Sequence, residues 1–204
     1  MGARNNSEGK PYFTQRNNRI KPGESCNVTS IINALSAAGW PVENMAEKEQ
    51  VEDELHRFIL TDVMVDKFWR RIDPNGAIPP NEWHEVLAFG TNRWIAKRGF
   101  SACVFFKEGV GFDRVINTIN DGGSLVMSGR FGIANGGKID HMVAVVGYDG
   151  DSLIIDDPWG DYRDGYTTIK GDNVLLARAD FDKIFKPLDK VKKWGHIVSP
   201  YKEA

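Results

Sequence analysis

Several features that mark particular classes of protein are scarce or missing in this sequence. Two cysteines in 204 residues are too few for the disulfide framework of a small secreted domain. The formal net charge of −2 argues against the broad basic field with which proteins bind nucleic acids. The apolar runs are far shorter than the roughly 18 residues that a membrane-spanning helix needs. The polar stretch 1–13 has no apolar segment of the kind found in a secretory signal, so we expect a soluble, cytoplasmic protein.

The rest of the composition is that of an ordinary globular protein. Hydrophobic residues make up 41% of the chain and charged residues 26%, a balance that can bury a core. We expect one domain, 1–204, with a helical part at about 26–98 and a sheet part at about 100–200. Apolar residues at helical spacing predict helices at 26–38, 41–72 and 81–99. A turn-rich segment at 73–80 separates the last two helices.

The second half of the chain is dominated by strand-like runs between Gly and Asp turns. These runs lie at 100–106, 122–129, 140–150, 151–160 and 173–181. A short helix is predicted at 112–121, and a short strand at 12–14 within the N-terminal arm. The letters YDGDS between two apolar runs predict a hairpin. Helices first and strands later indicate an α+β fold, with helices packed beside an antiparallel sheet.

Cys26 stands where the polar loop KPGES gives way to the first predicted helix. The N-terminal end of a helix carries partial positive charge, which lowers the pKa of a thiol and favours the reactive thiolate. Cys103 lies instead within the apolar run FSACVFF, so we expect a buried, unreactive core thiol there. Cys26 is therefore the candidate nucleophile, with packing as the alternative role for a cysteine at a helix start.

A histidine and an aspartate are predicted to meet at one end of the hairpin. His141 opens the strand MVAVVGY, and Asp157 precedes Pro158 at the end of the next strand. The hairpin brings the two side by side, where a carboxylate can orient an imidazole that activates a thiol. Asp156 competes with Asp157 for this role. Strand alternation points the two aspartates to opposite faces, so only one of them can reach His141.

The segments TQRNNRIKPGESCNVTSIINALSAAGW and HMVAVVGYDGDSLIIDDPWGDY resemble the papain-like cysteine peptidases, specifically the bacteriocin-leader-processing peptidase-like family, whose stand-alone members are common in bacteria and their phages. The family pattern is a Gln, a loop, a Cys at a helix start, a His that opens a strand, and Asp-Pro after a hairpin. The matching residues are Gln15, Cys26, His141 and Asp157. The resemblance implies a papain-like fold, in which an N-terminal helical half presents the nucleophile at a helix N-terminus and packs on a C-terminal antiparallel sheet.

The resemblance also implies an activity, that of a cysteine peptidase or amidase. Cys26 would form an acyl-thioester, His141 would act as base, Asp157 would orient it, and Gln15 would help to stabilise the oxyanion. The expected substrate is a peptide, a protein or a peptidoglycan stem peptide, with no cofactor and no metal. Two alternatives stay open: a catalytically inactive papain-like binding or structural module, and transglutaminase-like acyl transfer.

The sequence departs from the family pattern in the neighbourhood of the cysteine. Many members have Gly directly after the Cys, where this chain has Asn27. Gln15 lies eleven residues before Cys26, farther than in papain, so Asn17 or Asn18 is an alternative oxyanion donor.

The segment after the hairpin supplies aromatic and acidic side chains. Its aromatic residues are candidates for a wall of the cleft, with packing as the expected role of at least two of them: Trp159, Tyr162 and Tyr166. A solvated acidic loop, rather than a calcium site, is the expected role of its aspartates, which are Asp156, Asp157, Asp161 and Asp164.

Overall fold

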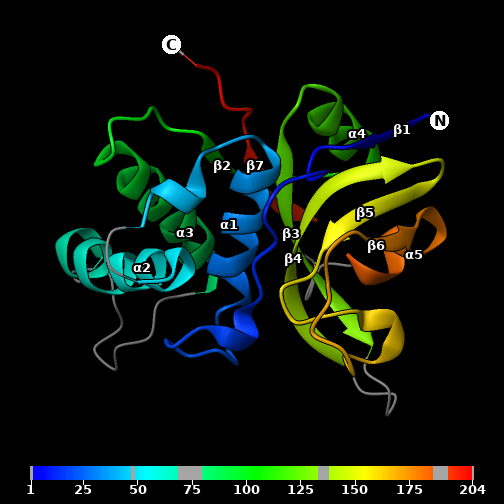
Figure 1. The fold of residues 1–204 in the computed structure, drawn as a ribbon, viewed down its shortest axis with the longest axis horizontal. Helices are drawn as coiled ribbons and strands as arrows, with labels where there is room; N and C mark the ends of the chain where they lie inside the picture. Colours follow the sequence, from blue (N-terminus) through cyan, green and yellow to red (C-terminus); the bar gives the residue numbers. More distant parts are fainter. Residues whose placement is uncertain (1, 47–48, 69–79, 133–137, 186–192, 204) are drawn as a thin grey trace.

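The computed structural model describes residues 2–46, 49–68, 80–132, 138–185 and 193–203 (Figure 1). The strands are β1 (Ala3–Asn5), β2 (Val104–Glu108), β3 (Ser124–Gly132), β4 (Lys138–Asp149), β5 (Ser152–Asp156), β6 (Val174–Ala177) and β7 (Trp194–Val198). The α-helices are α1 (Cys26–Ala37), α2 (Val51–Phe58), α3 (Pro80–Ala96), α4 (Phe112–Asn120) and α5 (Arg178–Ile184). The short 3-10 helices are η1 (Gln15–Asn17), η2 (Val42–Asn44) and η5 (Tyr162–Asp164), and η3 (Ile59–Phe68) is a π-helix.

The strands form one antiparallel sheet in the order β2-β7-β3-β4-β5-β6. β1 pairs with the last residues of β4, beyond the part of β4 that pairs with β3. Helices precede most of the sheet in the chain, which confirms the predicted α+β class. The YDGDS hairpin is also confirmed, because Asp149 pairs with Ser152 across the turn between β4 and β5.

Three local predictions were wrong. Residues 12–14, which the structure describes, form no strand, and the N-terminal strand lies at β1 instead. The helix expected over 41–72 is divided into η2, α2 and η3. β7 lies outside every run that was predicted as a strand. The predicted turn at 73–80 falls almost entirely outside the described residues.

Alternation along the central strands creates two hydrophobic cores, one on each face of the sheet. Met142 and Ala144 of β4 join the core that contains α1, α2 and α3. Val143 and Val145 point to the opposite face, where they join the core of α4 and α5. Figure 1 shows α1 at the centre of the molecule, between the other N-terminal helices and the sheet.

Residues Asn27 to Ala37 of α1 are all buried, its polar side chains included. Its polar side chains are tolerated there because they bond to backbone groups of the N-terminal segment and of β4. The side-chain amide of Asn33 exchanges two hydrogen bonds with the backbone of Phe13, at 2.8 and 2.9 Å. Ser30 Oγ donates to the carbonyl oxygen of Met142 at 2.8 Å. The Ser30 bond fixes the helix against β4, the strand that contains His141, which lies inside β4 and does not open it as predicted.

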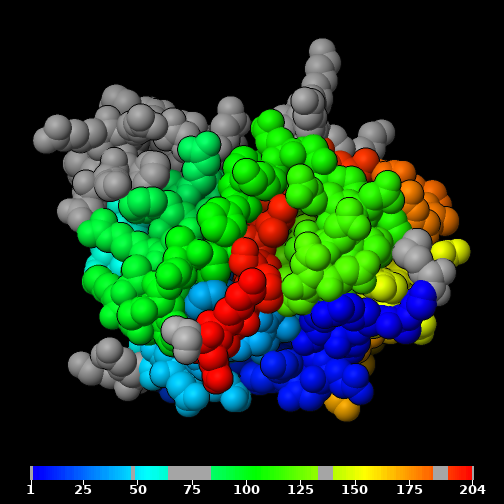
Figure 2. All heavy atoms as spheres, turned by 90° about the horizontal axis from the view of Figure 1, so that it is seen from above, coloured from blue at the N-terminus to red at the C-terminus, as the bar shows by residue number. Residues whose placement is uncertain are grey.

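The C-terminal residues tie the helical half to the sheet. Figure 2 shows them (red) running across the upper face of the molecule, beside the green of the segment that contains β2. The backbone N–H of Ser199 donates to the carbonyl oxygen of Cys103, and that of Tyr201 donates to Ala38. The predicted burial of Cys103 is confirmed, since this residue is 1% exposed. No helix in the described ranges is both long and apolar enough to cross a membrane.

Candidate active site

Cys26 is the first residue of α1, and its side chain is half-buried in an otherwise buried helix. Its thiol lies close enough to the imidazole of His141 and to the backbone N–H groups of Met142 and Asn27 for all three to lower its pKa. The start of α1 therefore places the thiol against His141 of β4, and the positive end of the helix dipole also favours a thiolate there.

His141 and Asp157 meet across the β4–β5 hairpin. The Nε2 atom of His141 lies 2.6 Å from Oδ1 of Asp157. Both side chains are buried, with 4% and 0% exposure. Because Asp157 occupies Nε2, the Nδ1 atom of His141 remains for the sulfur of Cys26. The structure thus brings three of the predicted site residues into one chain of contacts, from sulfur to imidazole to carboxylate.

The electrostatics of this chain of contacts favour a thiolate–imidazolium pair. Burial opposes charge on His141, but Asp157 and Cys26 outweigh it and raise the pKa of His141 to about 9. Burial also opposes the thiolate, but His141 and the two backbone N–H donors outweigh it and lower the pKa of Cys26. Between these two pKa values, the proton resides on the imidazole and the sulfur is ready to attack.

Asp157 is held on both of its carboxylate oxygens. The backbone N–H of Trp159 donates to Oδ1 at 2.9 Å, and the hydroxyl of Tyr166 donates to Oδ2 at 3.2 Å. The Asp157 backbone is fixed as well, because its N–H donates to the carbonyl oxygen of Gly171 at 2.7 Å. A Cβ on Gly171 would lie 1.9 Å from the Asp157 carbonyl oxygen, so only glycine permits this close approach.

The hydrogen bond from Tyr166 to Asp157 was not predicted from the sequence. Tyr166 was grouped with the aromatic residues expected mainly to pack, and it does lie in the core that contains α4 and α5. Its φ of +64° is unusual for a bulky residue, and no sequence signal marks that conformation. The hydroxyl reaches Asp157 only because the turn after η5 adopts it.

Asp156 takes a different partner from Asp157. Its Oδ1 accepts from the backbone N–H of Asn173 at 2.9 Å, and burial raises the pKa of Asp156 to about 7. Strand alternation therefore separates the two neighbours as predicted, and Asp157 is the one that contacts His141.

Gln15, the fourth predicted residue, lies between the two halves of the site. Its backbone N–H donates to the carbonyl oxygen of Pro158 at 2.9 Å, directly after Asp157. Its side-chain Nε2 donates to the carbonyl oxygen of Pro22 at 2.6 Å, in the loop that precedes Cys26. An amide nitrogen has two N–H groups, so the second one remains for a ligand. Among the described residues, no hydrogen bond joins Gln15 to the sulfur of Cys26.

The two asparagines that were alternatives to Gln15 differ from each other. Asn18 is buried, and its Nδ2 donates to Ser25 Oγ at 3.0 Å and to Thr29 Oγ1 at 2.9 Å. Both of its N–H groups are therefore used to hold the first turn of α1. Asn17 is exposed at the end of η1.

The aspartates after the hairpin do not form one solvated loop. Asp156 and Asp157 are buried, which contradicts the prediction for these two. Asp161 pairs with Arg163, and Asp164 accepts from Thr167 and Thr168. Within the described ranges, no group of three or more His, Cys, Asp or Glu side chains is arranged to hold a metal ion.

Comparisons with known proteins agree with this arrangement. The model of the Peptidase C39 like family matches residues 8–192, so the chain belongs to that family. The crystal structure of a Bacillus anthracis protein described as a C39-like peptidase aligns with a TM-score of 0.58 and 15% identity, covering 99% of this chain and 100% of that one. This likeness confirms the papain-like fold predicted above.

A second solved structure, the Pseudomonas avirulence protein AvrPphB, aligns with a TM-score of 0.38 and 13% identity. The alignment covers 98% of this chain and 96% of that one. No curated protein matches the chain.

Proposed function

We propose that this protein is a cysteine peptidase that cleaves an amide bond through an acyl-thioester on Cys26. The observation that carries the proposal is the unbroken series of contacts from Cys26 through His141 to Asp157. The opposite pKa shifts of the thiol and the imidazole support a preformed ion pair. Family membership adds the reaction class.

The contacts of the site and the family pattern support the following roles. The Cys26 thiolate attacks the carbonyl carbon of the scissile amide, and the carbonyl electron pair moves to the oxygen. The Gln15 amide and the Cys26 backbone N–H stabilise that oxyanion, an effect typically worth about 3 kcal/mol for each donor. His141 then gives its proton to the leaving amine, and Asp157 keeps the imidazole oriented. Water, deprotonated by His141, releases the acyl group and restores the thiolate.

The proposal is tested by comparing Cys26→Ala with wild type on a panel of coumarin-labelled peptide amides and on peptidoglycan fragments. We expect hydrolysis by wild type and no turnover by Cys26→Ala. Cys103→Ala is the matched control, and it should retain activity. Equal hydrolysis by Cys26→Ala and wild type would contradict the catalytic assignment. Labelled-amine incorporation in place of hydrolysis would reassign the reaction to acyl transfer.

A further inference from the structure

α2 holds the loop that connects Gln15 to Cys26, although α2 carries none of the residues assigned to the site. Asp53 is fully buried on this helix. Its carboxyl group accepts from the backbone N–H of Arg19 at 3.1 and 2.9 Å and from that of Ile20 at 2.9 Å. A carboxyl group buried in the protein is expensive unless such donors satisfy it, so these three bonds define its role.

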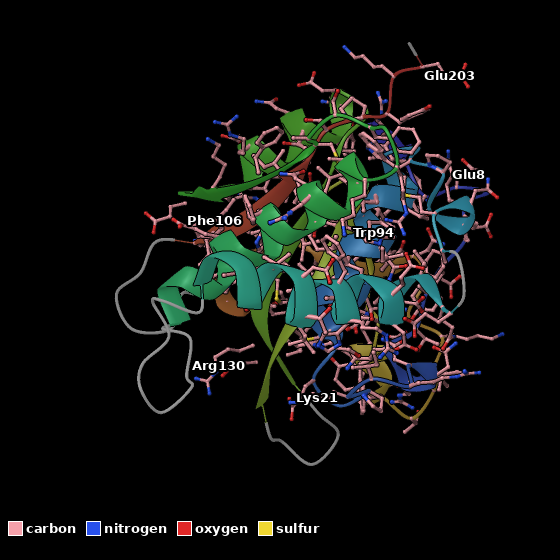
Figure 3. The ribbon with its side chains drawn as sticks, turned by 90° about the vertical axis from the view of Figure 1, so that its left-hand side faces the viewer. Glu8, Lys21, Trp94, Phe106, Arg130 and Glu203 are labelled. Atoms are coloured by element: carbon pink, nitrogen blue, oxygen red, sulfur yellow. The ribbon has the colours of Figure 1, made fainter. Side chains whose placement is uncertain are left out.

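One turn farther along α2, His56 lies close to the same peptide. Burial lowers the pKa of His56, although the nearby Asp53 and the backbone of Ile20 act to raise it. Figure 3 faces this side of the molecule: α2 runs across the front, and Lys21, next to Ile20, lies below it.

The peptide that Asp53 holds lies near the start of the loop 18–25, which joins η1, with Gln15, to Cys26 at the start of α1. On one side, the Pro22 carbonyl oxygen orients the Gln15 amide. On the other side, Asn18 fastens the loop to Ser25, the residue before Cys26. The distance between the Gln15 amide and the Cys26 backbone N–H therefore depends on the path of this loop. That path includes Lys21 at a φ of +46°, a conformation that the loop does not adopt without support.

We propose that Asp53 is a positioning residue for the oxyanion hole, acting through the loop 18–25. This inference rests on the proposed function. Asp53 takes no part in the contacts between Cys26, His141 and Asp157. Loss of its hydrogen bonds to Arg19 and Ile20 should therefore weaken oxyanion stabilisation while the thiolate–imidazolium pair stays intact.

Two small probes separate these effects. N-acetylglycinal adds to a thiol: the sulfur bonds to the aldehyde carbon, the carbonyl pair moves to oxygen, and the imidazolium proton neutralises it. The resulting hemithioacetal places its oxygen where the oxyanion would lie. Iodoacetamide reacts by displacement of iodide from a saturated carbon. The rate of this reaction depends on the Cys26 thiolate, and the reaction forms no oxyanion.

For Asp53→Ala, we expect the dissociation constant of the Cys26 hemithioacetal to rise about tenfold, with the alkylation rate of Cys26 within about twofold of wild type. Gln15→Ala should give the same pattern with a larger rise. If Asp53→Ala does not fold, Asp53→Asn retains one acceptor oxygen and should raise the dissociation constant about threefold.

Asn92→Ala is the matched control, because Oδ1 of Asn92 accepts from two consecutive backbone N–H groups, those of Cys103 and Val104. It should lose stability as Asp53→Ala does but leave both probe readings unchanged. The inference is wrong if Asp53→Ala and Asn92→Ala bind the aldehyde equally well. It is also wrong if Asp53→Ala loses aldehyde affinity and alkylation rate to the same extent. Absence of a hemithioacetal on Cys26 of wild type would instead refute the proposed function, and the inference with it.

Discussion

The two cysteines of this protein lie in opposite electrostatic environments. Cys103 is 1% exposed, and burial raises its pKa to about 12. Cys26 also experiences burial, but its contact with His141 reverses the sign and lowers its pKa. Burial alone thus makes a thiol inert. The reactive thiol arises where a helix start, two backbone N–H groups and an imidazole converge on one sulfur.

The same contrast holds for the histidines. His196 is fully buried, its Nε2 lies 2.9 Å from the carbonyl oxygen of His84, and burial lowers its pKa to about 4. His141 is almost as buried, yet Asp157 and Cys26 raise its pKa to about 9. The difference lies in the carboxylate and the sulfur, because a backbone carbonyl cannot compensate for burying the imidazolium.

Removal of the imidazole breaks the contrast most completely. His141→Ala should lower kcat/KM by about 1,000-fold, because it removes the base and the charge that stabilises the thiolate. The measurement is hydrolysis of the best peptide amide from the panel. His84→Ala, a half-buried histidine on α3, serves as control and should keep its activity. A loss below tenfold in His141→Ala would show that another group acts as base.

Asp157→Asn sharpens the contrast by leaving the ring in place. Without the charge of Asp157, the pKa of His141 should fall from about 9 toward its ordinary value of 6.5. The basic limb of the pH–activity profile should move down accordingly, and the loss at pH 8.5 should reach about 100-fold. At pH 6 the loss should be much smaller. An unshifted basic limb would mean that His141 is not the group that limits activity at high pH.

Asp156→Asn tests the aspartate next to Asp157, and we expect it to change the free energy of unfolding. Its pKa is raised from 3.8 to about 7, so the folded state binds the proton more tightly than the unfolded state. Stability therefore falls as the pH rises between these values. Asp156→Asn should stabilise the protein at pH 8 by about 2 kcal/mol, with no gain at pH 4. Urea denaturation at both pH values measures this, and a gain independent of pH would argue against titration of Asp156.

Tyr166→Phe should have the smallest effect of the four. It removes one hydrogen bond to Asp157 and keeps the packing, so kcat/KM should fall about fivefold, equivalent to about 1 kcal/mol. Tyr148→Phe is the matched control, because its buried hydroxyl donates to Asn120 at 2.9 Å, in another part of the fold. If the two variants lose activity equally, Tyr166 has no specific role at the site.

The sequence was sufficient to predict residues whose positions follow from local rules. A hairpin turn sets which strand ends meet, so the approach of His141 to Asp157 could be predicted from the YDGDS turn. A helix start could be predicted from the change in polarity around Cys26. The choice of Asp157 over Asp156 followed from strand alternation together with the family pattern.

The parts that could not be predicted depend on contacts distant in the chain. Tyr166 reaches Asp157 through a left-handed turn, and Asp53 reaches the loop before Cys26 from a separate helix. The burial of α1 depends on partners such as Phe13, whose backbone satisfies Asn33. No periodicity in the sequence encodes these pairings, since each joins a polar side chain to the backbone of a segment that only the tertiary fold brings near.

The most direct test of the central claim is the pH dependence of iodoacetamide alkylation at both cysteines in the same sample, resolved by peptide mapping. We expect rapid modification of Cys26 at pH 6 and no modification of native Cys103 at that pH. His141→Ala should slow the alkylation of Cys26 to the rate of an ordinary thiol, whose pKa is about 8.5. If wild-type Cys26 already reacts as slowly at pH 6 as an ordinary thiol, the thiolate–imidazolium pair does not exist and the account is wrong.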